Sequence, residues 1–375
     1  MSPFKLLFCC ALPLILLNTS CTEKFYPETD SDVSTLVVDG KITNESGPYE
    51  LRLFRTVDLI RVDSLKPEVN AEIILKDGLG NSEFFQEVRP GIYQTENNII
   101  RGTVGQTYWI EIETQTGKKY ESTPEKMPPP YDIENIYGKE EEKITSATEK
   151  QKVVNFYFNA KSNSQDANFI RWEYRESYEW RSPENLNTEK FTENPSKICF
   201  PVTNFPLVNI YDASGLNSKI ISKQATSTIY TNQVKLLYNY LIDMALFSTT
   251  PENYKFWENI KSVNFSEGGL FSAMTANITG NMIACDENCQ IIGYFEVSSV
   301  SRLQKFFTAN DFTLGFAKYP EECETMEIRE YPPDPAKFYI LSKKRVQETN
   351  IYTVRRKECY ECNVVHPVNK PSFWP

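Results

Sequence analysis

The chain has 375 residues, of which 40% are hydrophobic and 24% are charged, so it holds enough apolar material for packed cores. Fifty acidic residues against 40 basic residues give a net charge of -10, an excess of negative charge that disfavours binding to nucleic acid. The single histidine, His366, excludes metal sites built on several histidines and leaves one candidate for a histidine general base.

The N-terminus has the pattern of a lipoprotein signal peptide. Lys5 precedes an uncharged apolar run, Leu6–Leu17, which as a helix would span about 18 Å and is too short for a hydrocarbon core of about 30 Å. Small residues stand directly before Cys21, which resembles the lipobox cut by lipoprotein signal peptidase. We therefore expect residues 1–20 to be removed, Cys21 to be lipidated and residues 21–34 to form a flexible tether. The alternative is an ordinary signal peptide followed by a chance cysteine.

Residues 35–127 have the pattern of an immunoglobulin-like β-sandwich. Tyr108, Ile110 and Ile112 alternate with outward residues, which is the period expected of a half-buried strand. Turn-forming sequences rich in Gly, Asn and Pro separate several such segments, and this density of short strands is typical of a sandwich. The predicted strands are Thr35–Ile42, Tyr49–Thr56, Glu72–Lys76, Glu83–Val88, Thr107–Thr114 and Lys119–Thr123.

A stiff connector, Pro124–Pro130, separates this region from a larger β-rich domain, which we expect over residues 128–375 with one or two short helices. The charged run Lys139–Lys143 is predicted to be a solvated loop. Alternating aromatic residues in Val153–Phe158 and Phe169–Trp180 predict strands with aromatic inner faces. Such a face could bind sugar rings, but core packing is the commoner role.

One helix is well signalled, and one later segment is ambiguous. Thr250 can cap a helix, Pro251 suits its first position, and Tyr254, Trp257 and Ile260 recur on one face. The stretch Gly293–Phe307 is predicted to begin as a strand and to continue past the pair Ser298-Ser299.

An ordered set of short segments resembles a family of unknown function, the domain-of-unknown-function family numbered 4249, which comprises lipoproteins of Bacteroidetes outer membranes. The segments are Leu36–Asn44, Pro48–Leu53, Glu252–Trp257, Gly268–Phe271, Thr279–Asn281, Ile292–Phe295, Cys359–Cys362 and Pro371–Trp374. The resemblance implies an N-terminal β-sandwich and a larger β-rich region. It also implies that a TonB-dependent outer-membrane transporter is the partner, and it provides no catalytic residues.

Six cysteines follow Cys21, namely Cys199, Cys285, Cys289, Cys323, Cys359 and Cys362. An even number in an exported chain predicts disulfides, with fifteen possible connectivities. Zinc is an alternative, because Cys359-x-x-Cys362 followed by His366 has ligand-like spacing and Cys323 could be a fourth ligand. A redox site at the same pair is another alternative, but no βαβ context surrounds it.

No segment after the signal peptide has eighteen consecutive apolar residues, so we expect anchoring in the outer membrane by lipid alone, on the periplasmic or cell-surface face. The sequence contains no nucleophile elbow, P-loop, Rossmann glycine pattern or EF-hand loop, so we expect neither catalysis nor a cofactor or metal. We expect a non-enzymatic binding or accessory subunit of a TonB-dependent transporter in nutrient uptake. The alternatives are a surface hydrolase with paired carboxylates and a structural component of outer-membrane assembly or adhesion.

Overall fold

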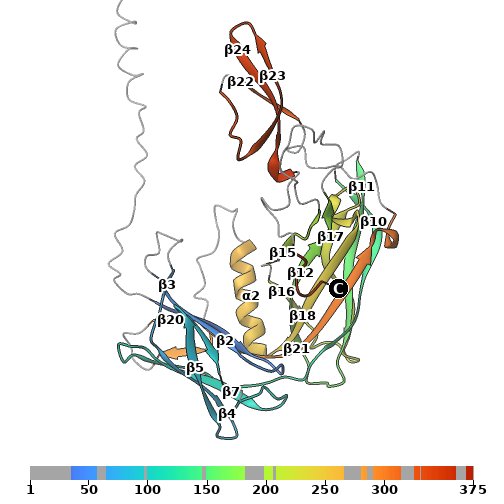
Figure 1. Cartoon of the computed structure of the whole chain (residues 1–375). Helices are drawn as coiled ribbons and strands as arrows, with labels where there is room; N and C mark the ends of the chain where they lie inside the picture. Colours follow the sequence, from blue (N-terminus) through green and yellow to red (C-terminus); the bar gives the residue numbers. More distant parts are fainter. Residues whose placement is uncertain are drawn as a thin grey trace, which may run out of the picture. The chain divides into compact units, whose positions relative to one another are not determined.

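The structure, a computed structural model of the whole chain, describes residues 35–56, 65–96, 99–145, 149–181, 198–205, 208–265, 280–284, 290–313, 325–329, 331–359 and 369–374. The expected signal peptide, the tether with Cys21, and His366 lie outside these ranges. The prediction of a mainly β fold is confirmed, since strands predominate and α2 (Pro251–Phe265) is the one α-helix in the described ranges (Figure 1). No helix in these ranges is long and apolar enough to cross a bilayer.

The first sheet contains eleven strands, and all six strands predicted within residues 35–127 are among them. Its strands are β1 (Leu36–Ile42), β2 (Glu50–Thr56), β3 (Leu65–Pro67), β4 (Glu72–Asp77), β5 (Ser82–Arg89), β6 (Ile92–Thr95), β7 (Thr107–Glu113), β8 (Lys119–Ser122), β9 (Glu125–Lys126), β19 (Met282–Ala284) and β20 (Ile291–Val297). The order is β19-β8-β7-β4-β5-β6-β2-β1-β20, with β3 beside β2 and β9 beside β7. The last two strands in sequence, β19 and β20, therefore come from beyond residue 128.

The alternation of apolar residues explains which face of this sheet is buried. In β7, Tyr108, Ile110 and Ile112 are each at most 2% exposed, as their period of two predicts. They pack in one core with residues of β1, β2, β4, β6 and β20. A core shared by early and late strands ties residues 291–297 to the N-terminal region.

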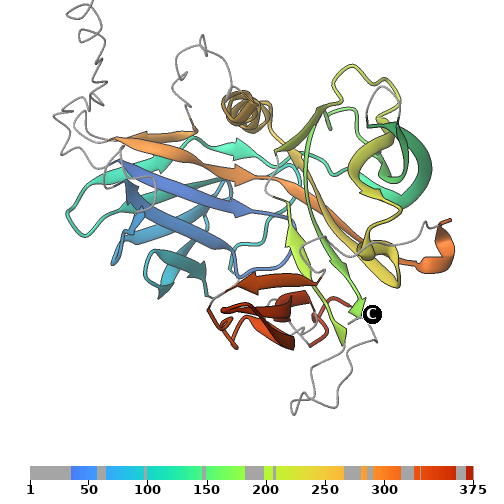
Figure 2. The same cartoon turned by 90° about the horizontal axis from the view of Figure 1, so that it is seen from above.

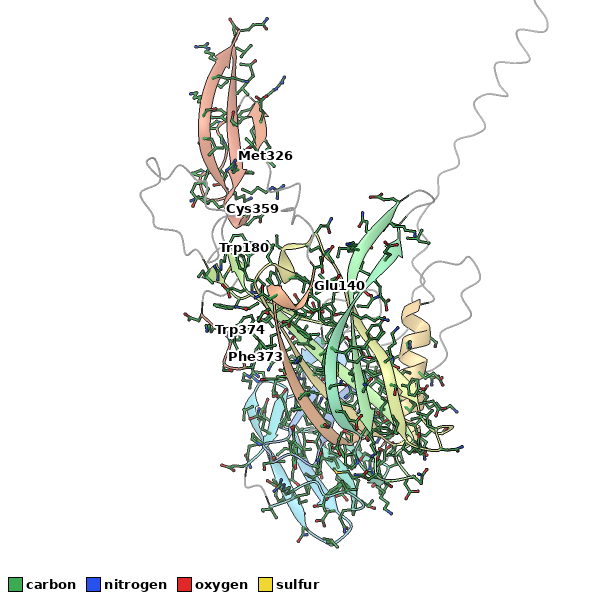
Figure 3. All side chains as sticks on the ribbon, turned by 90° about the vertical axis from the view of Figure 1, so that its right-hand side faces the viewer. Glu140, Trp180, Met326, Cys359, Phe373 and Trp374 are labelled. Atoms are coloured by element: carbon green, nitrogen blue, oxygen red, sulfur yellow. The ribbon has the colours of Figure 1, made fainter. Side chains whose placement is uncertain are left out.

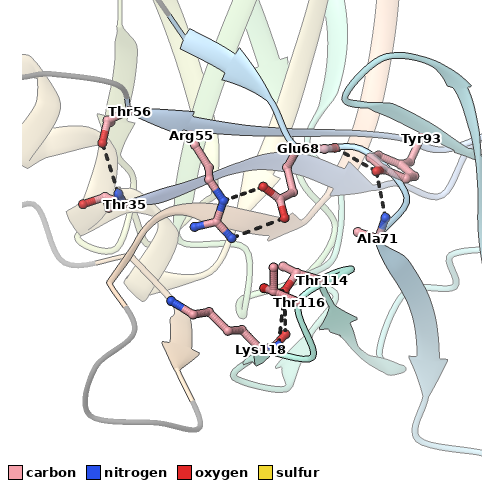
Figure 4. Close-up of polar contacts among 9 residues, drawn as sticks. All are labelled: Thr35, Arg55, Thr56, Glu68, Ala71, Tyr93, Thr114, Thr116 and Lys118. Atoms are coloured by element: carbon pink, nitrogen blue, oxygen red, sulfur yellow. Dashed lines mark hydrogen bonds and ion pairs between the residues drawn. The ribbon is translucent and has the colours of Figure 1, made fainter. Parts of the chain in front are cut away.

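Polar side chains fasten the β2, β3 and β6 strands of this sheet (Figure 4). Arg55 on β2 forms an ion pair with Glu68, which follows β3. The hydroxyl of Tyr93 on β6 donates to the Glu68 carbonyl at 2.8 Å and accepts from the Ala71 amide at 3.1 Å. These contacts hold the segment between β3 and β4 against β6.

Two further sheets face each other across a second core. The second sheet is β10 (Asp132–Ile144), β11 (Lys150–Lys161) and β17 (Ile220–Tyr230). The third sheet is β15 (Val202–Asn204), β12 (Phe169–Tyr178), β18 (Asn239–Thr249) and β21 (Ser299–Thr308), with β16 (Asn209–Asp212) also beside β12. Phe156, Phe158, Trp172 and Tyr174 are buried in the core between them, so the predicted aromatic inner faces are confirmed.

The prediction of a loop at Lys139–Lys143 is wrong, because these residues belong to β10. Lys139 to Lys143 pair residue by residue with Asn155 to Gln151 of β11. Backbone pairing to a buried neighbour stabilises the strand, while the charged side chains stay at the surface. The run of charged residues therefore did not indicate that this segment pairs with β11.

The remaining elements lie outside these three sheets. They are the pair β13 (Trp180–Arg181) and β14 (Ile198–Cys199), the sheet β22 (Met326–Arg329), β24 (Thr349–Arg356) and β23 (Phe338–Val346), and the 3-10 turns η2 (Val234–Leu236), η3 (Ala309–Asp311) and η5 (Lys357–Cys359).

The ambiguous stretch around Ser298 forms two strands that belong to different sheets. β20 runs parallel to β1 in the first sheet, and after Ser298 the chain continues as β21, antiparallel to β18 in the third sheet. Figure 2 shows this orange segment passing from the first sheet into the third. Ser298 and Ser299 are fully buried, and the Ser298 amide donates to the Ile42 carbonyl at 3.1 Å. We call residues 291–308 the crossover segment; it brings the two sheets together at the site described next.

Candidate functional site

The outer face of the third sheet carries a row of charged side chains on β12. Arg171, Glu173 and Arg175 point away from the core because they alternate with the buried aromatic residues of the same strand. The strand register places Glu173 opposite Ala245 of β18, and Ala245 opposite Arg302 of β21. Side chains from three strands therefore meet on one surface.

Arg171 is the centre of this surface. The residue is 4% exposed. Its Nη2 donates to Oε2 of Glu296 on β20 at 2.8 Å, and its Nη1 donates to Glu173. The guanidinium carbon lies 4.4 Å from the centre of the Phe247 ring and 4.9 Å from that of Trp257 on α2. One side chain thus links the third sheet, the crossover segment and the helix.

Every charged group in this row has an opposite charge beside it. Burial lowers the pKa of Arg171, but the carboxylates of Glu296 and Glu173 outweigh it, so the pKa lies above its usual value. Burial raises the pKa of Glu173, but Arg171 and Lys41, which lies 3.6 Å away, bring it below the ordinary range. The surface is densely charged but locally balanced.

Two more ion pairs continue the row. Arg175 Nε donates to Asp243 at 2.6 Å, and Arg302 Nε donates to Glu45 at 2.7 Å. Glu45 lies in the connection between β1 and β2, so this second pair again joins the first sheet to the third.

Two adjoining cavities open beside this row. The sheet-face cavity has a volume of about 420 Å³ and is lined by Arg171, Trp172, Glu173, Tyr174, Arg175, Asn204, Phe205, Val208, Asn209, Asp243, Ala245, Trp257 and Arg302. The junction cavity has a volume of about 500 Å³ and is lined by Val37–Lys41, Glu50, Arg52, Arg171, Glu173, Asn253, Phe256, Trp257, Ile260, Gly293, Tyr294 and Glu296. Arg171, Glu173 and Trp257 line both. Both volumes lie in the range of small-molecule sites.

Helix α2 supplies the wall of the junction cavity, and its start is fixed as the sequence predicts. The Asn253 amide donates to Thr250 Oγ1 at 3.2 Å, which is an N-cap hydrogen bond. The same hydroxyl donates to Oε2 of buried Glu125 on β9 at 3.0 Å. The cap therefore connects the helix to the first sheet.

Glu125 is the centre of a buried polar cluster behind the junction cavity. Its carboxylate accepts from the Tyr294 hydroxyl and, at 3.3 Å, from Asn281 Nδ2. Burial raises the pKa of Glu125 to about 7, although the hydrogen bonds from Tyr294 and Thr250 oppose the shift. The pKa of Tyr294 is also raised, by burial and by the adjacent Glu125.

The last aromatic residues of the chain lie on the same face of the third sheet (Figure 3). The Phe373 ring centre is 3.7 Å from the Arg175 guanidinium, and Trp374 packs edge-on against Phe200 and Phe306. Phe373 thus lies beside the sheet-face cavity, on the side where Arg175 forms its wall.

Of the predicted site residues, only Cys199 and Cys359 lie within the described ranges. Cys199 on β14 and Cys359 in η5, the latter labelled in Figure 3, are both disulfide-bonded. Cys285, Cys289, Cys323 and Cys362 lie outside the described residues, as do Cys21 and His366. Over the described ranges, no three His, Cys, Asp or Glu side chains converge as a metal site.

The residues around the two cavities were missed by sequence reasoning. The sequence of β12 did contain a pattern that could have indicated one wall of the cavities. The charged residues 171, 173 and 175 alternate with aromatic residues in a strand that is buried on one face. Lys41, Trp257 and Glu296 carried no such signal, because only tertiary structure brings their separate elements to this point.

Comparisons with known proteins identify a family without a known activity. The family model for "Domain of unknown function (DUF4249)" matches residues 22–304. No curated protein matches the chain. A solved structure described as "Biofilm associated protein - BSP domain" is 9% identical, with 74% of this chain covered and a TM-score of 0.12, too low to inform on the fold. The chain covers 60% of the length of that structure. The match over residues 22–304 shows that the chain belongs to the DUF4249 family.

Proposed function

We propose that the protein is an outer-membrane lipoprotein, anchored through Cys21, that acts as a non-enzymatic binding or accessory subunit. The observation that carries the binding role is the pair of cavities that meet at Arg171, Glu173 and Trp257. Concave sites of this size with a few convergent polar groups are typical of ligand binding. The anchor is supported by the short apolar run that ends before Cys21.

The state of the carboxylates supports binding rather than catalysis. Glu173 has a lowered pKa because Arg171 and Lys41 stabilise its charge, so it is a poor proton donor near neutral pH. Glu125 has the pKa of a general acid, about 7, but it lines neither cavity. The group best suited to proton transfer is therefore away from the space that a substrate would occupy.

The proposed partner is a TonB-dependent transporter that functions in nutrient uptake, as the family resemblance implies. A tether of residues 21–34 would span roughly 20 Å root-mean-square, by about 5–6 Å times the square root of its length. This reach suits docking on a neighbouring membrane protein. Anchoring both proteins in one bilayer raises their effective concentration, so a modest interface is sufficient.

The experiment is affinity purification from the native membrane after gentle detergent extraction. We expect a β-barrel transporter in near-equal amount with the wild-type protein, and loss of the protein from the membrane fraction or blocked maturation with Cys21→Ala. Tyr331→Ala, at a position that is 77% exposed, is the control for a substitution outside the lipobox. Recovery of the lipoprotein alone, under conditions that preserve other transporter complexes, contradicts the partner. Turnover of a glycan or peptide that Glu173→Gln abolishes contradicts the non-enzymatic role.

A further inference from the structure

The junction cavity is bordered by an unusual set of unpaired polar atoms. Five buried side-chain atoms have no hydrogen-bond partner among the described residues. They are Arg171 Nε, Trp257 Nε1, Glu296 Oε1, and Nδ2 and Oδ1 of Asn253. All four residues line this cavity. Arg171 and Glu296 are 4% exposed and Asn253 is 0% exposed, so these groups are not simply solvated at the surface. Buried polar groups normally have partners, so a cluster of five such atoms beside one cavity calls for a ligand.

The chemistry of these atoms selects among ligand classes. Arg171 Nε, Trp257 Nε1 and Asn253 Nδ2 are donors, whereas Glu296 Oε1 and Asn253 Oδ1 are acceptors. A phosphate or carboxylate offers acceptors only and would face the Glu296 carboxylate. An ammonium group offers donors only and would face the Arg171 guanidinium. A hydroxyl group donates and accepts, so a ligand with several hydroxyls can satisfy the whole set.

The pairing of charges in both cavities also favours a ligand with hydroxyl groups over a charged ligand. Arg171 is paired with Glu296 and Glu173, and Arg175 is paired with Asp243. A charged ligand would have to break one of these pairs, whereas a neutral ligand can bond to the free lone pairs and N–H groups that remain. The row therefore favours a polar ligand without net charge.

An aromatic side chain stands where the two cavities meet. Trp257 lines both and stacks on the Arg171 guanidinium. Phe256, its neighbour on α2, lines the junction cavity with Tyr294, and their ring centres are 4.9 Å apart. Aromatic rings beside hydrogen-bonding groups suit the alternating C–H faces and hydroxyls of a pyranose ring.

We propose that the two cavities form one binding site for a neutral oligosaccharide, with Trp257 between two sugar subsites. This inference rests on the binding role proposed above and names its ligand class. The Trp257 ring stacks on the Arg171 guanidinium, and Arg171 Nε is buried, so a sugar that bonds to this atom displaces the ring. Binding should therefore change the fluorescence of Trp257.

The test uses the purified full-length mature protein and a panel of neutral gluco-, manno-, galacto- and xylo-oligosaccharides. Sialylated glycans, sulfated glycans and short peptides represent the competing ligand classes. We expect at least one neutral glycan to bind in calorimetry and to change tryptophan fluorescence. Trp257→Ala should weaken binding more than 10-fold. Trp257→Phe, which keeps a ring but lacks the N–H, should weaken it by a smaller factor and remove part of the fluorescence change.

Tyr331→Ala is the matched control, since Tyr331 is 77% exposed and lines neither cavity. It should bind as the wild type does, and thermal melting of each variant shows that the fold is retained. Binding of acidic glycans or peptides alone, no binding of any neutral glycan, or binding that folded Trp257→Ala and Trp257→Phe leave unchanged overturns the proposal. Copurification of the transporter is scored separately, so a failed ligand class is distinguished from a failed accessory role.

Discussion

Nη2 of Arg171 lies 2.8 Å from Oε2 of Glu296, although Arg171 is on β12 of the third sheet and Glu296 is on β20 of the first sheet. Both side chains are buried. The pair sits where the crossover segment passes between the two sheets, so it stabilises the contact on which the junction cavity depends.

Removing one partner of this pair should be far more costly than replacing both. Glu296→Leu leaves the Arg171 charge buried without its main counter-charge, and we expect the free energy of unfolding to fall by about 3–5 kcal/mol. The double variant Arg171→Met, Glu296→Leu should recover much of this loss, because no buried charge remains. Lys344→Ala, which breaks the exposed pair with Glu327, should cost less than about 1 kcal/mol. Chemical denaturation measures all three, and equal losses for Glu296→Leu and Lys344→Ala would contradict the role of the pair.

Glu125 should make stability depend on pH between about 4.5 and 7. The pKa is about 7 in the folded protein against an ordinary value of 4.5, so the folded state holds a proton that the unfolded state has lost in this window. The stabilisation is complete below pH 4.5 and is lost as pH rises through 7, by about 3 kcal/mol at about 1.4 kcal/mol per unit.

Glu125→Gln tests this assignment by removing the titrating group and keeping the side-chain shape. The variant should lack this part of the pH dependence and should be more stable than the wild type above pH 7. Glu134→Gln, at an exposed position of β10, should follow the wild-type curve. Urea unfolding at several pH values gives the comparison, and parallel curves for wild type and Glu125→Gln would refute the assignment.

Gly293 should be intolerant of any side chain. Its φ is +112°, and a Cβ there would lie 1.9 Å from the Val38 carbonyl oxygen, within the β1–β20 pairing. Gly117 also has a positive φ, +78°, but a Cβ there would meet nothing within 4 Å. We expect Gly117→Ala to lose about 1–2 kcal/mol from backbone strain and Gly293→Ala to lose above about 4 kcal/mol. Thermal or urea unfolding measures the loss of stability in each variant. Similar losses for Gly117→Ala and Gly293→Ala would mean that the close approach of β1 and β20 is not needed for stability.

The six cysteines after Cys21 should be oxidised in the exported protein. Cys199 and Cys359 are disulfide-bonded in the structure, and an oxidising compartment favours the same state for the other four. Alkylation under denaturing, non-reducing conditions should label few of the six, whereas alkylation after reduction should label all of them. Mass spectrometry counts the labelled cysteines in each case. Stoichiometric labelling of six free thiols would contradict the disulfides, and one bound zinc ion per chain would support the zinc alternative.

Local pattern was sufficient for six of the eleven strands of the first sheet and for the start of α2. The period of two in β7 and the Thr250 cap each depend on residues close in sequence, so the sequence alone identifies them. The charge run in β10 failed as a predictor because the pairing with β11 contributes more than the polarity of its side chains. The β-propensity of a segment does not predict which neighbouring strand it pairs with.

The candidate site was beyond the reach of such patterns. Arg171 and Glu296 are 125 positions apart in sequence, and neither stands in a recognised motif. Their pairing follows from the change of sheet at Ser298, which the alternation of residues 293–307 does not encode. Only the β12 row of alternating charged and aromatic residues could have pointed to one wall of the cavities.

The crossover segment also bears on what happens if the chain is divided. A fragment ending at residue 127 would lack β20, and β1 would then present an open edge of unpaired backbone groups. Such an edge accepts a strand from any source, so the fragment should self-associate when expressed alone. A synthetic peptide covering residues 290–298, added in trans, would occupy that edge in parallel register and restore a monomeric fragment.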